Sequence, residues 1–267
     1  MSLIIFKTII SIVVVLALIF VSERNPKLGG LLAGLPIGTG IMIFFYSIEQ
    51  GTSFVVQGIP YGISGLVSSL SFTVGFYLGG KQFTNRPILH VTTAFLSGLL
   101  AFFVVGYVVS ILKINLITSL IIFIAGTTLA ILFFRHIPID KKSIPKKLTL
   151  STVLFRSLFV TITVLLITGV AKIIGVQWAG IMASFPTGLS PLLIVLAYSY
   201  ENELYPTVLR NFSYSITTLT VFYLLVLWLF PLMGVCYGSL IAYLVCFVYL
   251  YFLSKIKLQT LLFSNVT

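Results

Sequence analysis

Few residues in this chain of 267 could do chemistry: it holds five Asp or Glu, two His and two Cys. The two histidines, His90 and His136, lie apart from the acidic residues in the sequence. No group of residues has the spacing of a metal site, a Ser-His-Asp set or a phosphate-binding glycine loop. The sequence therefore predicts no catalytic residue, no metal and no cofactor, and a protein that is not an enzyme.

The charged residues inside or beside apolar segments are the first candidates for a functional role. Glu49 and Glu201 each close an apolar segment. Ionisable groups at membrane depth are costly and are usually retained for use, so both are candidate coupling or gate residues for a proton or another cation. The alternative is that they are solvated at helix ends. Lys7, Arg156 and Arg210 join this set, as groups that attract an anionic substrate or that snorkel to the interface.

Two segments interrupted by Gly and Pro, 33–40 and 183–191, are the best candidates for a binding site. Proline removes an amide donor and strains the carbonyl four residues earlier, so the carbonyls of Leu32 and Met182 are predicted to face a shared polar cavity. Paired breaks of this kind mark the sites of secondary transporters. The alternative is that they only kink and pack the helices. The candidate substrate-binding residues are Pro36, Gly38, Thr39, Ser184, Pro186, Thr187, Gly188 and Ser190.

The composition predicts that lipid is the solvent for much of this chain. Apolar residues make up 59% and charged residues 8%, and the mean hydropathy is +1.17, whereas a soluble domain has roughly a quarter charged residues. The net charge of +11 does not indicate nucleic acid, because the basic residues lie in short strips between apolar runs. About nine runs are long enough to span a bilayer, at roughly 3–21, 28–48, 58–79, 88–110, 114–134, 152–174, 177–199, 206–230 and 232–253.

The basic residues also predict the orientation in the membrane. With the polar linker 135–151 inside, 13 of the 16 Lys and Arg lie inside and 3 lie outside. The positive-inside rule then places the N-terminus outside and the C-terminus inside. We expect a multi-pass protein of a bacterial inner (cytoplasmic) membrane.

The two ends of the chain resemble each other. Phe6-Lys7 opens the first stretch as Phe155-Arg156 opens the second, and a Gly precedes Pro36 and Pro186 by six residues in both. Four helices, one linker helix and four more would place the second unit upside down. The predicted fold is an all-α polytopic membrane protein with two inverted four-helix repeats. The predicted parts are 1–110, the linker helix and basic loop 111–151, and the inverted repeat 152–267.

The second half resembles the GlpM family of small four-helix bacterial membrane proteins, from Phe155 to about Phe230. The resemblance rests on Phe155-Arg156, Ala171-Lys172, Trp178-Ala179-Gly180-Ile181, Phe185-Pro186 and the turn with Glu201. It is fainter in the first half, at Gly30 and Leu35-Pro36. The half-size members of that family are consistent with an origin by duplication.

These observations predict a secondary-transporter-like protein that moves a small solute or a lipid-linked precursor by alternating access. The alternatives are a channel, a membrane scaffold or assembly protein without transport, and a lipid-modifying membrane enzyme. The predicted partners are the lipid bilayer, the unknown solute and a proton or cation, with no nucleic acid. A homodimer is compatible with all of these functions.

Overall fold

The computed structural model describes residues 5, 7–9, 12–13, 34–83, 86–135, 137, 149–198 and 204–263. Residues 5, 7–9 and 12–13 are helical, within the first predicted span. The side chains of 204, 254 and the residues after 255 are not described.

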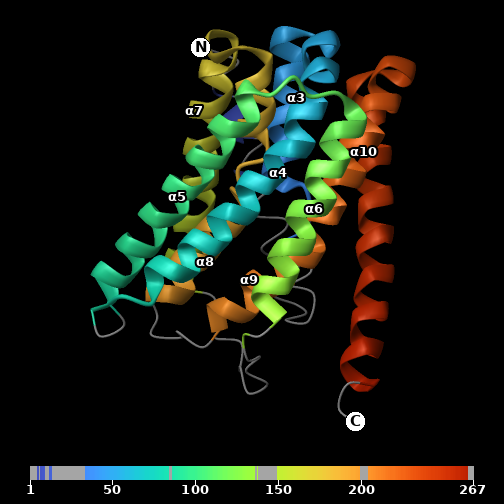
Figure 1. The fold of residues 1–267 in the computed structure, drawn as a ribbon. Coiled ribbons are helices and arrows are strands. Elements are labelled where there is room, and N and C mark those ends of the chain that lie inside the picture. The colour runs from blue at the N-terminus through green and yellow to red at the C-terminus, as the bar shows by residue number, and fades with distance from the viewer. Residues whose placement is uncertain are drawn as a thin grey trace.

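Every regular element in the described part of the chain is a helix, and that part contains no strand, which confirms the all-α prediction. Figure 1 shows the helices as one bundle, with α4 between α5 and α6. The elements are α3 (Ile37–Gln50), α4 (Thr52–Gly80), α5 (Pro87–Ile111), α6 (Leu116–Arg135), α7 (Leu150–Ala183), α8 (Leu189–Tyr198), α9 (Leu204–Ser215) and α10 (Thr217–Phe263).

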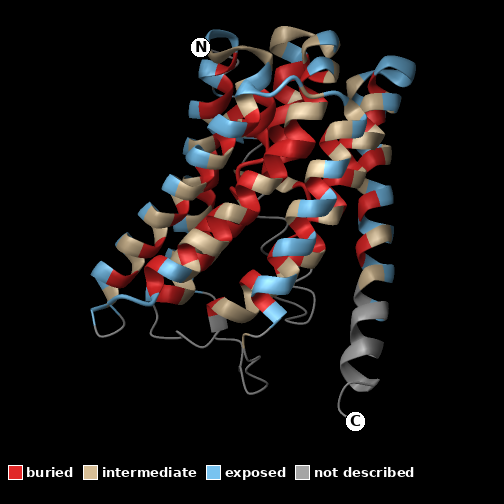
Figure 2. Cartoon of the chain, viewed as in Figure 1, coloured by how far each residue is buried: buried red, intermediate tan, exposed pale blue. Residues whose placement is uncertain are grey.

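Five of the described helical stretches are long and apolar enough to cross a membrane, consistent with a multi-pass membrane protein. The most apolar window of α4 is 67% buried, whereas that of α6 is only 22% buried. The central helix is therefore α4, and exposed residues alternate with buried ones along the outer helices (Figure 2). Many of the exposed residues are large and apolar. Leu100, Ile117 and Ile173 are 67%, 70% and 84% exposed. An apolar surface this large is stable when lipid covers it.

The helix starts follow local chemistry. Asn115 caps α6: its Oδ1 accepts from the Thr118 amide, and the Thr118 hydroxyl accepts from the Asn115 amide, both at 2.9 Å. This reciprocal pair satisfies two amides that have no partner inside the helix. Pro87 opens α5 at a position where no amide donor is needed. Such caps matter because lipid offers no hydrogen bonds to a free backbone group.

Helix α10 is a hairpin of two antiparallel arms that meet at Gly234, whose φ is 78° and ψ is 172°. The Tyr249 hydroxyl donates to Thr217 Oγ1 at 3.1 Å. Near the turn, Gly238 lies against Phe230. Residues far apart in α10 thus touch, which a straight helix of that length would not allow.

The chain of α7 also doubles back, at Gly175 (φ 79°, ψ 172°). Phe95 of α5 packs against Phe159, and Phe102 of α5 packs against Phe185. Phe95 and Phe102 are about 10 Å apart along α5, whereas a straight helix would separate Phe159 and Phe185 by about 39 Å. The second arm of α7, from residue 176 to Ala183, therefore runs back beside the core and leads through a short break into α8.

The predicted spans 58–79, 88–110 and 114–134 correspond to α4, α5 and α6, although α4 begins earlier, at Thr52. The later spans correspond to the arms of α7 and α10 with α8 and α9. The start of the predicted span 28–48 and most of the linker 135–151 lie outside the described residues. The total of nine crossings, the three-part division and the orientation stay predictions.

The two turn glycines should be intolerant of a side chain. Their backbone conformation is almost confined to glycine, and a Cβ at either position has no neighbour within 4 Å. We expect Gly175→Ala and Gly234→Ala each to lower the free energy of unfolding by about 1–3 kcal/mol, measured by denaturant unfolding in detergent micelles. The control is Gly169→Ala within α7, which also has no neighbour within 4 Å and should be neutral or slightly stabilising. Equal effects at all three positions would contradict the two turns.

Candidate functional site

The two predicted breaks have the same backbone geometry, 150 positions apart in the sequence. In the first break the Ile37 amide donates to the Leu35 carbonyl at 2.8 Å, and in the second the Thr187 amide donates to the Phe185 carbonyl at 2.7 Å. Each pair closes a tight three-residue turn. Each proline carbonyl then accepts the first helical bond, from Gly40 at 2.7 Å and from Ser190 at 2.8 Å, respectively.

The structure brings the two breaks into direct contact in the interior. Pro36 and Pro186 are both buried. Gly38, two residues after the first proline, lies so close to Thr187 that an added Cβ would overlap the threonine side chain. Of the other candidate binding residues, Thr39, Ser184 and Ser190 are buried and Gly188 is half-buried. The eight residues predicted from the sequence thus lie in the two segments that meet.

Two further contacts are related to each other by the same shift of 150 positions in the sequence. Gly34 of the first break lies against Ser215 of α9, and Ser184 of the second break lies against Gly65 of α4. Gly34 corresponds to Ser184, and Gly65 corresponds to Ser215. Each break therefore packs against the equivalent position of the other half of the chain.

Hydroxyl groups from the opposite half satisfy backbone carbonyls at both breaks. The Tyr243 hydroxyl of α10 donates to the Pro36 carbonyl at 3.0 Å. The Ser69 hydroxyl of α4 donates to the Ser184 carbonyl. A buried carbonyl left without a donor costs about 1–3 kcal/mol, so the Ser69 bond stabilises the second break. The Pro36 carbonyl already accepts from Gly40, and the Tyr243 bond adds a second contact between the two halves.

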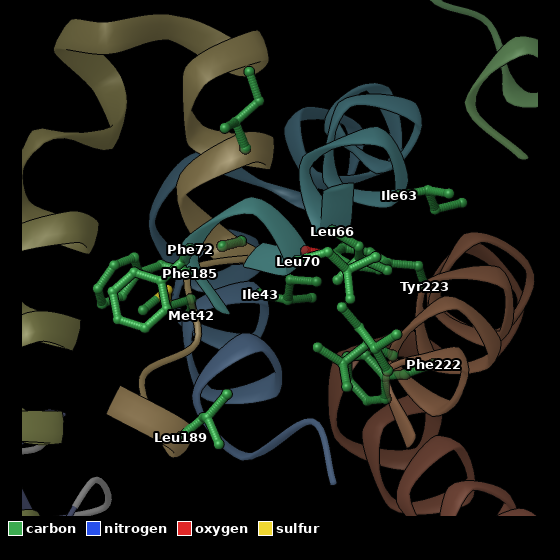
Figure 3. Close-up of a cluster of buried hydrophobic side chains, with 14 of the residues drawn as sticks. Met42, Ile43, Ile63, Leu66, Leu70, Phe72, Phe185, Leu189, Phe222 and Tyr223 are labelled. Atoms are coloured by element: carbon green, nitrogen blue, oxygen red, sulfur yellow. The ribbon is translucent and has the colours of Figure 1, made fainter. Parts of the chain in front are cut away.

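Aromatic and aliphatic side chains pack around the breaks. Phe185, directly before the second proline, packs edge-on against Phe72 with ring centroids 5.9 Å apart (Figure 3). Met42 and Ile43 of α3 lie in the same cluster. The expectation of a freed carbonyl at Met182 is wrong, because this carbonyl accepts from the Phe185 amide at 3.0 Å. Leu32 lies outside the described residues.

A buried ion pair lies at one end of the bundle. The Lys7 ammonium is 2.5 Å from Glu49 Oε1, with side chains 6% and 17% exposed. Lys7 Nζ also donates to Thr168 Oγ1 of α7 at 2.8 Å, and it lies 5.5 Å from the Phe45 ring centroid. Glu49 is thus paired and only partly exposed at its helix end, and Lys7 is buried and does not snorkel. The pair links the first segment and α3 to α7.

The other predicted charges lie elsewhere. Arg210 of α9 donates to the Ile137 carbonyl at 3.2 Å. Arg156 is half-buried on α7, and Glu201 lies outside the described residues. His90 is 1% exposed and packs edge-on against Tyr205 of α9, with ring centroids 5.8 Å apart. His90 is therefore an interior residue and not an interfacial one.

Sequence reasoning missed several residues of these sites. Thr168, Ser69 and Tyr243 are ordinary polar residues within long apolar runs, and only their burial in three dimensions identifies them. The one usable signal was Gly65, because a small residue at the middle of an apolar helix permits a close approach by a neighbour. Among the described residues, no cluster of three or more His, Cys, Asp or Glu could hold a metal ion.

Comparison of the chain with protein-family models, with curated proteins and with solved structures finds no match.

The contact between the breaks makes Gly38 sensitive to size. We expect Gly38→Ala to lower the free energy of unfolding by about 1–3 kcal/mol, because the methyl group would force Thr187 to move. Gly188 is its counterpart in the second break, and an added Cβ there has no neighbour within 4 Å. Gly188→Ala should change stability far less. Thermal unfolding in micelles measures both, and equal losses would show that the breaks do not touch through Gly38.

The ion pair should behave as a buried unit. We expect Lys7→Met to destabilise the protein by about 1–3 kcal/mol, because it leaves the partly buried Glu49 carboxylate unpaired. The double variant Lys7→Met with Glu49→Leu should recover most of that loss, because an apolar pair of similar volume needs no compensation. Lys113→Met, at an exposed lysine, is the matched control and should stay within about 0.5 kcal/mol of the parent. A double variant no more stable than the single one would contradict the pairing.

Proposed function

We propose that this chain is a secondary-transporter-like membrane protein that moves a small solute or a lipid-linked precursor by alternating access. The observation that carries the proposal is the meeting of two helix breaks with the same backbone geometry, Leu35-Pro36-Ile37 and Phe185-Pro186-Thr187, inside the bundle. Discontinuous helices that meet between two repeats form the substrate sites of many secondary transporters.

The proposal includes two inverted four-helix repeats joined by a linker helix, with nine crossings in all. The exchanged contacts support it, since Gly34 with Ser215 and Gly65 with Ser184 are related by one constant shift. The paired helices α4 and α5 also have a counterpart in the two arms of α10, which fold back on each other at Gly234. An odd number of helices between equivalent units inverts the second unit. The membrane is proposed to be a bacterial inner membrane, with the N-terminus outside, and the GlpM-like origin by duplication fits this arrangement.

The close contact between Gly38 and Thr187 identifies this conformation as one whose centre is closed. With the breaks packed together, the middle of the bundle has no room for a solute between them. In the proposed cycle this central contact opens, and the two halves separate first at one end of the bundle and then at the other. Half-helix ends supply partial charges to a solute there, so the site needs no buried full charge.

We propose that Lys7, Glu49 and Thr168 form the gate at one end. Glu49 holds Lys7 in place, and Lys7 reaches across to Thr168 in the other half. Protonation of Glu49, or displacement of the Lys7 ammonium from Glu49 by another cation, would weaken the gate and couple its opening to an ion. Arg156, Arg210 and Glu201 are proposed to serve the same role elsewhere.

A static scaffold is the second candidate, and the tight packing of the breaks is the observation that favours it. Neither candidate needs a catalytic residue or a cofactor. The scaffold would keep one conformation, whereas a carrier would have two.

Spin labels at the two ends of α5 and α7 test the proposal. The background carries Cys236→Ser and Cys246→Ala. One pair of labels replaces Ile111 and Ile173 at the end near Lys7, and a second pair replaces Ile88 and Leu150 at the opposite end. All four parent side chains are exposed. We expect two distance populations at each end in liposomes, and these populations should change in opposite directions at the two ends when the pH or the cation is changed. The measurement is pulsed electron–electron double resonance.

The variant Thr168→Val distinguishes a carrier from a static scaffold. It removes the bond across the gate but keeps the ion pair, and a bond to a charged donor contributes about 1.5–3 kcal/mol. The longer distance between labels at 111 and 173 should therefore gain population about tenfold or more. A label pair at Leu78 and Leu100, within the antiparallel α4 and α5, is the control and should keep one distance. A single, unchanged distance at both ends would leave the scaffold as the function.

A further inference from the structure

A small hollow lies between the two halves, and its open space is about that of one water molecule. Residues of α3, α4, the second arm of α7 and α10 line it: Ile43, Tyr46, Phe54, Val55, Gly58, Ile59, Val176, Gly180, Ala183 and Tyr223.

Two of these residues carry polar groups that have no partner in the described part of the chain. The side chains of Tyr46 and Tyr223 are 3% and 1% exposed, and both hydroxyl oxygens lack a hydrogen bond there. Burying one such hydroxyl without a partner costs about 1–3 kcal/mol. Two of them beside the same hollow indicate that something in the hollow supplies the missing bonds.

The walls decide what kind of group fits. Apart from the two phenols, the lining consists of aliphatic, aromatic and glycine residues and contains no charged side chain. An ion there would lose its hydration without gaining a counter-charge, which is prohibitive in an apolar site. Glu49, one turn along α3 from Tyr46, is already neutralised by Lys7. The occupant is therefore neutral.

A phenol both donates and accepts a hydrogen bond, so two phenols can hold one group that also does both. Water and an alcohol have this property. A water in such a place is normal for a protein of this size, since about one water is buried per 27 residues. The neighbouring glycines, Gly58 and Gly180, permit the close crossing of α4 and α7 that forms one wall.

We propose that the hollow between Tyr46 and Tyr223 is a binding site for one water molecule, which hydrogen-bonds to both phenols. The site requires only the two phenols and the hollow, and it does not depend on the proposed transport function.

The experiment uses the full chain in liposomes, with tyrosine labelled with ¹³C at Cζ. Water-edited solid-state NMR detects which tyrosines receive magnetisation from nearby water. The signals are assigned by their loss in Tyr46→Phe and Tyr223→Phe, with Tyr237→Phe at an exposed tyrosine as the matched control.

We expect transfer from water to both Tyr46 and Tyr223. Absence of transfer from water to either tyrosine would overturn the proposal.

Stability gives a second readout. In a dry hollow, Tyr46→Phe and Tyr223→Phe would remove an unpaired buried hydroxyl and stabilise the protein. With an occupant present, both should lower the thermal midpoint, and stabilisation by both would overturn the proposal. No ion gradient is involved, so a single distance in the spin-label experiment would exclude transport and leave this site standing.

Discussion

The backbone carbonyls at the two breaks must find donors inside the protein, because a bilayer core supplies none. This constraint determines how the halves fit together. The Ser184 carbonyl accepts from Ser69 of α4, and the Pro36 carbonyl, which already accepts from Gly40, gains a second bond from Tyr243 of α10. Each half therefore donates a bond to the break of the other half, and the second break would lose its Ser69 donor in a half that folded alone.

Close approach is the second condition, and small residues provide it. Helices in lipid gain little from hydrophobic association, so they rely on packing and hydrogen bonds. Gly58, Gly62 and Gly65 lie on the face of α4 that meets α7 and Tyr223. Gly75 and Gly79 lie near Ser97 of α5. The central position of α4 thus follows from two glycine surfaces, one toward each neighbour, and the Ser69 bond to the second break depends on that position.

Much of this architecture could be read from the sequence, and the limits have physical causes. Long apolar runs predicted α4, α5 and α6, since hydropathy depends only on composition. The positions of both breaks could be predicted, because proline and glycine act locally. The close packing of Gly38 on Thr187 could not, since it depends on how segments far apart in the sequence meet.

The same limit applies to the polar contacts. Glu49 and Lys7 were both candidates, but their pairing and the bond from Lys7 to Thr168 can be identified only in the folded bundle. The matching backbone turns give the predicted repeat a local structural counterpart at Pro36 and Pro186. The number of crossings and their direction depend on parts of the chain beyond the described residues.

Helix α3 connects the three polar features of the bundle. Its start holds Gly38 at the contact of the breaks, its middle holds Tyr46 at the hollow, and its end holds Glu49 at the ion pair. A helix of 14 residues moves as a nearly rigid rod, because each turn is bonded to the next. A rigid-body shift of α3 would therefore move Glu49, Tyr46 and Gly38 together. Because Gly38 has no free space toward Thr187, such a shift would either open the contact or be resisted by it, and in the proposed cycle α3 would link the gate to the centre of the bundle.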